Sequence, residues 1–422
     1  MGQEGSTNLF VKNRTKLAAL LDDDALCVVF SNQKMPRNGD QFYSFRQNSD
    51  FYYLTGIEEE ESILLLDQNQ ALLFIPETSE QKVLWEGPRL TREKAETISG
   101  VGQIERLEAF DKTLEKRVPG KKCMYFNLPL KIANTGIKSR DELFLDKFRA
   151  QYPFHIVRSL KPALSKLRLI KEPTELKAIK KAIAITEQAF LRALSILEPG
   201  MPEKTVEAEI TRELIRNRAQ GFAFEPIIAS GKNATVLHYT NNNDTCRANE
   251  LLLMDFGAEY NNYAADISRT LPVNGQFSRR QKACYQAVLD VMGKAMEEIK
   301  PGVTIESLNK SVVKALTEKH LELGLYKERD LQDNGDQQWK KYFPHGVSHF
   351  MGLDVHDTGD KKTPLKKGMV ISWEPGLYIP EEHIGIRIED DILVDDKPVN
   401  LSSSIPKDPE HLESLMQKSK TG

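Results

Sequence analysis

The sequence is poor in cysteine and has no long apolar run. Its four cysteines are scattered over 422 residues without CxxC spacing. This argues against a disulfide framework and a thiolate metal site, and it favours a reducing, cytoplasmic location. No stretch approaches the roughly 20 apolar residues of a membrane-spanning helix, so we expect no membrane association. The first residues, MGQEGSTNLFVKNR, also lack the apolar core of a secretory signal.

An excess of positive charge is absent as well. The chain has 58 lysine and arginine residues against 61 aspartate and glutamate residues, for a net charge of −3. The basic residues are dispersed, whereas a nucleic-acid-binding domain normally gathers them on one face. We therefore expect no nucleic-acid partner.

Length and patterning predict two domains. Residues 1–166 alternate short apolar runs with helical stretches, which is typical of a smaller N-terminal α/β domain. The expected strands are ALCVVF (25–30), SILLLD (62–67), ALLFIP (71–76) and KVLWEG (82–87), and the expected helices are 91–100 and 139–151.

A basic, proline-marked segment, SLKPALSKLRLIKEP (159–173), separates the domains. We place the boundary near residue 166, which leaves residues 167–422 for the second domain. Pro173 suits the first turn of a helix, because an N–H at that position would have no helical partner. An apolar stripe follows at helical spacing: Leu176, Ile179, Ile183, Phe190 and Leu194.

The second domain contains a faint internal repeat. ILEPGMPEKTVEAEI (196–210) is echoed by EIKPGVTIESLNKSV (298–312), and each predicts a helix, a Pro-Gly break and a second helix. A pair of acids in apolar surroundings follows each copy. If a pseudo-two-fold axis relates the copies, the two acid pairs face each other.

Four of these acids and one histidine carry the chemistry. An unpaired carboxylate in an apolar run is costly to bury, and no lysine or arginine adjoins Asp255 or Glu374 in their runs. Four carboxylates with one imidazole suit two divalent ions of the manganese type, whose charge offsets that of the acids. Such a pair of ions activates water for attack on a carbonyl, so amide hydrolysis is expected. The five residues are Asp255, Asp266, His349, Glu374 and Glu389.

Hairpin geometry supports the same grouping. The runs around Asp255 and Asp266 flank EYNNY (259–263), which predicts a turn. The two residue numbers have an odd sum, which places both side chains on one face of a hairpin with a two-residue loop. The same parity holds for Glu374 and Glu389, and a turn centred near residues 381–382 would set them opposite each other.

Longer motifs carry a resemblance to a known family. FRQNSDFYYLTGI (45–57) is similar to the signature of the N-terminal domain shared by aminopeptidase P and some prolidases. The remaining motifs resemble the catalytic domain of aminopeptidase P: VLHYTNNN, MDFGAEYNNYAADISRT, HGVSHFMGLDVHD, EPGLY and GIRIEDD. This group of metallopeptidases also includes prolidase and methionine aminopeptidase. The resemblance covers nearly the whole chain and implies an α/β (α+β) "pita-bread" fold with two related halves for residues 167–422.

The resemblance also implies roles for the five ligand residues. Asp266 and Glu389 would bridge two metal ions. Asp255 would complete the coordination of one ion, and His349 and Glu374 that of the other. Glu374 would also relay a proton between the attacking water and the departing amine.

Five further residues acquire expected roles in the same way. His238 and His345 resemble histidines that line a proline pocket, and His356 resembles one that stabilises the oxyanion, so all three are expected to bind substrate and assist catalysis. Tyr378 and Arg387 resemble groups that hold the ligands in place beside the substrate. Ordinary strand packing with a surface ion pair is the alternative for these two.

The implied activity is hydrolysis of the N-terminal Xaa-Pro bond of peptides with proline in second place. Two divalent ions are expected, with Mn²⁺ favoured and Co²⁺ or Zn²⁺ as alternatives. The family also implies a homo-oligomer, a dimer or tetramer, in which Trp85 reaches a neighbouring subunit's site unless it is an ordinary core residue.

Two other functions remain open. A prolidase, which cleaves only Xaa-Pro dipeptides, shares all five ligand residues. A catalytically inactive module of the same fold could instead bind peptides or proteins, although inactive relatives have lost ligands that this chain keeps.

Overall fold

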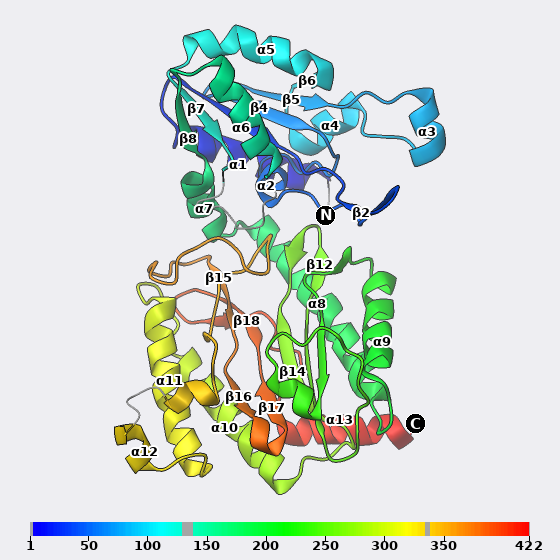
Figure 1. The fold of residues 1–422 in the computed structure, drawn as a ribbon, viewed down its shortest axis with the longest axis vertical. Coiled ribbons are helices and arrows are strands. Elements are labelled where there is room, and N and C mark those ends of the chain that lie inside the picture. Colours follow the sequence, from blue (N-terminus) through cyan, green and yellow to red (C-terminus); the bar gives the residue numbers. More distant parts are fainter. Residues whose placement is uncertain (1–2, 129–137, 334–337, 422) are drawn as a thin grey trace. The chain divides into compact units, whose positions relative to one another are not determined.

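The computed structural model describes residues 3–128, 138–333 and 338–421. The chain divides into two compact units, Met1–Arg168 and Leu169–Gly422, and each unit contains its own sheets (Figure 1). Within the described ranges, every helix is too short or too polar to span a bilayer.

The first unit is built on a six-stranded mixed sheet with the order β6-β5-β4-β1-β7-β8. The central strand β1 is antiparallel to β4 and parallel to β7. Buried side chains such as Val28, Leu65 and Phe74 form the core with Phe110 and Phe148 from flanking helices. The strands are β1 (Ala25–Phe30), β4 (Ile63–Leu66), β5 (Ala71–Ile75), β6 (Gln103–Arg106), β7 (Cys123–Phe126) and β8 (Ile156–Ser159), with a separate hairpin β2 (Pro36–Asn38) and β3 (Gln41–Phe42).

The first three strands and both helices expected in this unit are confirmed, but the strand expected at 82–87 is wrong. That segment lies in a helix, which begins after Ser79, whose side chain accepts the Lys82 N–H at 3.2 Å, and ends at Gly87. None of its residues is buried, so the apolar run has no core face to line. The helices are α1 (Gln3–Ala18), α2 (Ser49–Thr55), α3 (Glu80–Glu86), α4 (Arg92–Ser99), α5 (Phe110–Arg117), α6 (Arg140–Gln151) and α7 (Lys161–Leu169).

The second unit begins with the predicted amphipathic helix. Pro173 is its first residue, and Ile179, Ile183 and Phe190 are buried. A second helix and a group of strands follow it. These elements are α8 (Pro173–Ile196), α9 (Glu203–Arg216), β9 (Gly221–Phe222), β10 (Ile227–Ser230), β11 (Leu251–Phe256), β12 (Ala258–Tyr260), β13 (Tyr263–Ala264) and β14 (Ile267–Pro272).

The predicted turn in EYNNY is confirmed. Asn261 and Asn262 have φ values of 50° and 62°, the left-handed conformation required by a two-residue hairpin loop. The ladder that leads away from this turn pairs Asp255 with Ser268. Asp255 and Asp266 therefore share a face, as the parity predicts, and Ser268 lies on that face too.

The second half of this unit repeats the order helix, Pro-Gly break, helix, hairpin. In its hairpin, Trp373 pairs with Asp390 and Gly376 pairs with Arg387. Both ladders have the predicted register. The elements are α10 (Arg279–Met296), α11 (Ile305–Glu322), α12 (Glu328–Asp333), β15 (Val370–Trp373), β16 (Gly376–Ile379), β17 (Ile384–Arg387), β18 (Asp390–Leu393), β19 (Val399–Asn400) and α13 (Pro409–Thr421).

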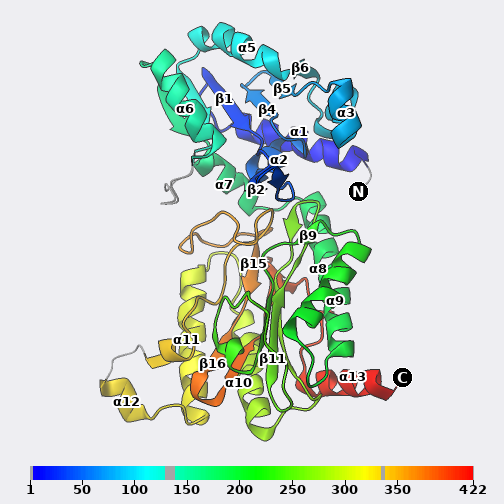
Figure 2. The same cartoon turned by 45° about the vertical axis from the view of Figure 1, so that its right-hand side comes forward.

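The hairpins of the two halves meet in the middle of the unit. The Glu389 N–H donates to the Ser268 carbonyl at 3.0 Å. Gly385 in β17 lies so close to another segment that an added Cβ would be 2.0 Å from the Ala234 carbonyl oxygen. Figures 1 and 2 show the α8–α9 pair on one side of these strands and α11 on the other. The helix–strand order thus brings two acid-bearing hairpins together.

Candidate metal centre

Three of the four acids lie where strands are interrupted. Asp255 is inside β11, but Asp266 directly precedes β14. Glu374 lies between β15 and β16, and Glu389 lies between β17 and β18. The backbone N–H of Glu374 therefore bonds outside its own hairpin, to the Val347 carbonyl at 2.9 Å. At these breaks the backbones of different segments come close enough for their carboxylates to meet.

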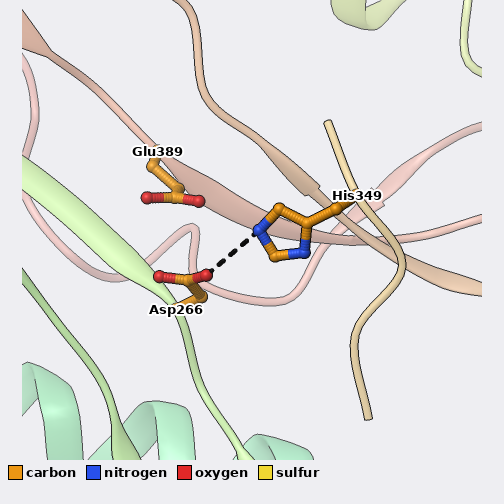
Figure 3. A group of neighbouring side chains, drawn as sticks. All are labelled: Asp266, His349 and Glu389. Atoms are coloured by element: carbon orange, nitrogen blue, oxygen red, sulfur yellow. Dashed lines mark ion pairs between the residues drawn. The ribbon is translucent and has the colours of Figure 1, made fainter. Parts of the chain in front are cut away.

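Asp266, His349 and Glu389 form the centre of the site. One potential ligand atom from each lies within 4.8 Å of the others. His349 Nε2 is 3.3 Å from Asp266 Oδ2 and 3.6 Å from Glu374 Oε1. Figure 3 shows the His349 ring directed at Asp266, with Glu389 beside both. Two acids and one imidazole from three separate chain segments thus point into one small volume.

The electrostatics of this cluster call for a cation. Burial, together with the charge of Asp255, holds the pKa of Asp266 well above its usual range. Burial and the charge of Asp266 do the same to the pKa of Glu389. In addition, Asp255 Oδ1 is buried and has no hydrogen-bond partner among the residues that the structure describes. Carboxylate oxygens with one imidazole are suitable ligands for a divalent ion such as Mn²⁺, so the residues fit a metal site.

The orientation of His349 also fits metal binding. Its Nδ1 lies 3.1 Å from the Phe350 carbonyl oxygen, which can only accept a hydrogen bond. A proton on Nδ1 satisfies this carbonyl and leaves Nε2, which faces Asp266 and Glu374, free to bind a metal ion. A ligating histidine is commonly held in its tautomer by such a backbone carbonyl.

Arg387 and Tyr378 form a buried support behind the acids. Arg387 Nη2 donates to Asp255 Oδ2 at 2.5 Å, Nε donates to Ser268 Oγ at 2.8 Å, and Nη1 donates to Tyr378 Oη at 2.9 Å. Arg387 is only 4% exposed, so its pairing with Asp255 is not a surface ion pair. The sequence run around Asp255 contains no cation because Arg387 supplies one from the other hairpin.

The chain of hydrogen bonds continues to His345. Its Nε2 lies 2.8 Å from Tyr378 Oη, and its Nδ1 lies 2.9 Å from the Gly346 carbonyl oxygen. Nδ1 is also 3.5 Å from Glu374 Oε2. Burial lowers the pKa of His345, which favours the neutral ring with its proton on Nδ1. Burial also raises the pKa of Tyr378 to about 12, so its hydroxyl stays protonated and donates to Nε2.

All three expected histidines and all five expected ligand residues line one pocket, whose volume is about 660 Å³. The His356 ring makes an edge-on contact with His349, with 4.4 Å between their centroids. Tyr378 is buried behind the lining. The pocket is lined by Phe224, Glu225, Ile227, Leu237, His238, Thr240, Asp255, Asp266, His345, Gly346, Ser348, His349, Phe350, Val355, His356, Asp357, Gly359, Lys361, Glu374, Arg387 and Glu389.

Sequence reasoning missed three polar residues that contact the acids. Ser268 Oγ donates to Glu389 Oε2 at 2.8 Å, and Ser372 Oγ donates to Glu374 Oε1 at 3.3 Å. The Asp391 carboxylate accepts the Asp266 N–H at 3.3 Å. Each of the three lies two residues from one of the expected ligands. The alternation of side chains along a strand is therefore the signal that could have found them.

Comparisons with known proteins agree with this geometry. A model described as "Metallopeptidase family M24" matches residues 177–396, and one described as "Aminopeptidase P, N-terminal domain" matches residues 10–125. The chain therefore belongs to metallopeptidase family M24 and carries the N-terminal domain of aminopeptidase P.

Individual relatives are similar to this chain over nearly its whole length. The chain is 34% identical to the Xaa-Pro aminopeptidase of Haemophilus influenzae, over 96% of each protein. It is 31% identical to Escherichia coli aminopeptidase P with the inhibitor Pro-Leu, with a TM-score of 0.90 and 99% of each chain covered. The zinc-substituted form of that enzyme in complex with product is 30% identical, with a TM-score of 0.89, covering 98% of this chain and 99% of that one. The expected fold, family and class of enzyme, a metalloaminopeptidase, are confirmed.

Proposed function

We propose that this chain hydrolyses the N-terminal Xaa-Pro bond of peptides with the help of two divalent metal ions. The observation that carries the proposal is the group of four buried or half-buried acids and His349 on the wall of one pocket. Membership of family M24 and full-length similarity to Xaa-Pro aminopeptidases support the same reaction.

In this proposal, Asp266 and Glu389 would hold both ions. Asp255 would help to hold one ion, and His349 with Glu374 would help to hold the other. The unpartnered Asp255 Oδ1 and the lone pair of His349 Nε2 support these assignments. Bound divalent ions would supply a hydrolytic nucleophile near neutral pH and polarise the scissile carbonyl.

Glu374 moves the proton in the proposed reaction. Leaving proline departs as a secondary amine, so its nitrogen has to be protonated. Glu374 is half-buried, and Ser372 Oγ, a donor 3.3 Å away, orients its Oε1. A carboxylate held at the pocket wall can accept a proton from the attacking water and deliver it to the amine.

The histidines shape the rest of the pocket. We assign His238 and His345 to the faces that receive the proline ring, and His356 to stabilisation of the developing oxyanion. The ring of His345 is fixed by Tyr378 and Gly346, which preorganises that face before substrate binds. Arg387 and Tyr378 keep Asp255 and His345 in place, and Arg387 reaches the pocket wall itself.

We propose Mn²⁺ as the metal, with Co²⁺ and Zn²⁺ as alternatives, because oxygen ligands predominate. The structure of zinc-substituted E. coli aminopeptidase P supports zinc as one alternative. The four cysteines are unpaired and buried, in keeping with the reducing cytoplasm we propose.

We also propose a dimer or tetramer in which Trp85 reaches a neighbouring subunit. Trp85 is 80% exposed on α3, so the alternative of a core tryptophan is wrong. Adjacent Leu84 is 83% exposed. The exposure of both side chains supports an interaction surface on this helix.

A paired substrate assay tests the activity. The protein is loaded with Mn²⁺ and given an Xaa-Pro-Yaa tripeptide and an Xaa-Pro dipeptide, each with and without a chelator. Release of Xaa from the tripeptide, abolished by the chelator, is the expected result. Cleavage of the dipeptide alone would identify a prolidase, and no turnover with bound metal would identify an inactive binding module.

A further inference from the structure

The basic segment at 159–173 places a buried cation, Lys171, behind a residue that lines the pocket, Asp357. Lys171 Nζ lies 3.3 Å from Asp357 Oδ2, and the side chains of the pair are 1% and 2% exposed. The Lys171 N–H is fixed as well, because it donates to the Gly368 carbonyl at 2.8 Å. Burying two charges is costly, so the Lys171–Asp357 ion pair is stable only if both side chains keep their favourable geometry.

Asp357 connects this cation to the histidine segment. It follows His356 directly and lines the same pocket. Its Oδ1 accepts the Thr358 N–H at 2.8 Å, while its own N–H donates to the Phe350 carbonyl at 2.8 Å. That carbonyl also accepts from His349 Nδ1 at 3.1 Å. One carbonyl oxygen thus joins the ring of a proposed metal ligand to the residue that Lys171 holds.

The space around Lys171 and Asp357 is tightly filled. A Cβ added to Gly352 would lie 2.3 Å from Asp357 Oδ2 and 3.0 Å from Lys171 Nζ. Tyr263 Oη donates to Glu175 Oε1 at 3.0 Å, and the charge of Lys171 counteracts the effect of burial on the pKa of Glu175, which still rises to about 7. Without Lys171, two acids in this enclosed region would lose their shared cation.

We propose that Lys171 is a positioning residue for the reaction: through Asp357 and the Phe350 carbonyl it fixes the segment 349–357, and with it the ring of His356. This inference rests on the proposed function, in which His356 faces the oxyanion. Lys171 does not line the pocket, so it acts on the reaction through the histidine segment and not on the substrate.

The closing experiment compares Lys171→Met with wild type in the Mn²⁺-loaded enzyme. Misplacement of a catalytic group by about 1 Å lowers rates by up to about 100-fold, so kcat should fall by about 10- to 100-fold while KM stays within about twofold. In a His356→Ala background the same substitution should lower kcat by much less than it does in wild type. Adding Asp357→Asn to Lys171→Met keeps the Thr358 acceptor and should lower kcat little further, because both substitutions break the same pair.

Hydrogen exchange supplies a readout that does not depend on turnover. The amides of Asp357 and Thr358 should exchange faster in Lys171→Met than in wild type, because their acceptors are no longer held. Leu316→Ala is the matched control, since it removes buried α11 packing away from the pocket lining and should lower the melting temperature without changing kcat of the folded enzyme.

Additivity of Lys171→Met with His356→Ala, an equal loss of kcat in Leu316→Ala, or unchanged exchange at Asp357 and Thr358 would each overturn the proposal. If Lys171→Met does not fold, Asp357→Asn weakens the same pair with little change in shape and must show the same selective loss of kcat. Failure of wild type to cleave Xaa-Pro peptides would sink the proposed function instead, while the exchange data would still test the positioning of the segment.

Discussion

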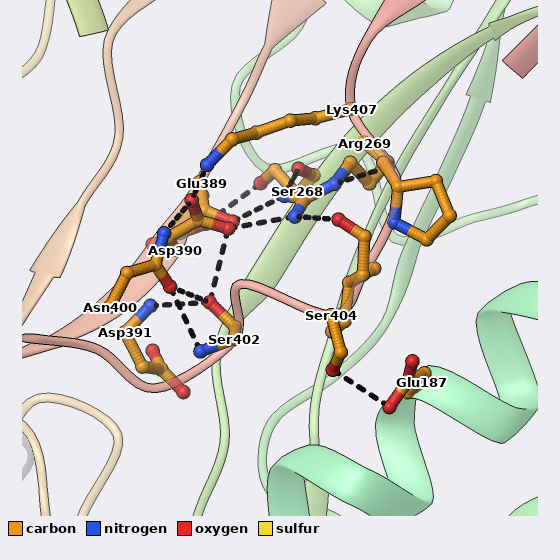
Figure 4. A network of polar contacts seen from close by, with 12 residues as sticks. Glu187, Ser268, Arg269, Glu389, Asp390, Asp391, Asn400, Ser402, Ser404 and Lys407 are labelled. Atoms are coloured by element: carbon orange, nitrogen blue, oxygen red, sulfur yellow. Dashed lines mark hydrogen bonds and ion pairs between the residues drawn. The ribbon is translucent and has the colours of Figure 1, made fainter. Parts of the chain in front are cut away.

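The acids that line the pocket and the acid cluster around Asp390 lie next to each other but are compensated in different ways. Asp390 follows Glu389 in the chain, and its carboxylate receives Arg269 at 2.7 Å, Lys407 and Asn400 (Figure 4). Although burial opposes ionisation, Arg269 and Lys407 keep the pKa of Asp390 below its usual value. Burial raises the pKa of neighbouring Asp391 well above its usual range.

This difference shows which buried carboxylates have their negative charge balanced by a cation of the chain itself. Arg269 is buried and also donates to the carbonyls of Glu389 and Ile405, so the cation is part of the fold. Within the described ranges, Glu389 and Asp266 form no ion pair with a lysine or arginine. The Asp390 cluster is therefore compensated within the fold, whereas Asp266 and Glu389 are left for the proposed metal ions to compensate.

Removing a pocket acid should have the largest effect. Asp266→Ala deletes an oxygen ligand proposed to serve both ions, so kcat/KM for an Xaa-Pro-Yaa tripeptide should fall by more than about a thousandfold, roughly 4 kcal/mol of transition-state stabilisation. Metal analysis should show fewer bound ions. Full turnover by this variant would mean that Asp266 is not a ligand.

Replacing Asp390 should mainly lower the stability of the folded protein. Asp390→Asn leaves Arg269 without its buried countercharge, which should lower the free energy of unfolding by about 3–5 kcal/mol. Urea denaturation measures the loss. The folded fraction should still bind metal, and an intact stability with lost metal would reverse the assignment of the two clusters.

Metal ions should stabilise the folded protein by binding to the pocket acids and not to the Asp390 cluster. At an ion concentration about 100 times the dissociation constant, binding to the folded state adds about 2.7 kcal/mol. The melting temperature of wild type should therefore rise with Mn²⁺, and that of Asp390→Asn should rise by a similar amount. Asp266→Ala is the control in which most of this rise should disappear.

A third acid, in the first unit, sharpens the comparison through pH. Although burial opposes ionisation, Arg168 and Lys161 lower the pKa of Asp50 to about 2, with contacts of 2.7 Å from each. Because the folded value is lowered, this stabilisation is present above the unfolded pKa of about 4 and is lost as pH falls toward 2. The free energy of unfolding should drop by about 2 kcal/mol over that interval.

Asp50→Asn provides the control for this effect. The variant should be less stable at neutral pH and should show a flatter decline between pH 4 and 2, measured by urea denaturation at each pH. An equally steep decline in the variant would assign the acid sensitivity to other carboxylates.

The sequence predicted the site where local periodicity decides the structure. Glu374 and Glu389 lie opposite each other because the turn is centred where expected, and the parity of Asp255 and Asp266 follows from the Asn-Asn loop. The pairing of Asp255 with Ser268 was not predicted, because the apolar runs do not fix how far the ladder extends from the turn. Strand periodicity also gave no sign that three acids lie at interruptions.

Long-range compensation was beyond sequence reasoning for a different reason. Arg387 reaches Asp255 from 132 residues away, and Arg269 reaches Asp390 from 121 residues away. Nothing in the local pattern shows that Asp390 receives the guanidinium of Arg269. The mistaken strand at 82–87 has a related cause, since the run is apolar but exposed and its helix is set by Ser79 and Gly87.

Gly385 restricts how this pocket can be redesigned. Its neighbour in space, Ala234, belongs to a short turn of chain that leads within four residues to His238. Any bulkier amino acid at 385 would push that turn outward and carry the imidazole with it. A combinatorial library aimed at new peptide preferences should therefore leave codon 385 untouched and randomise Leu237 or Thr240, which face the cavity directly.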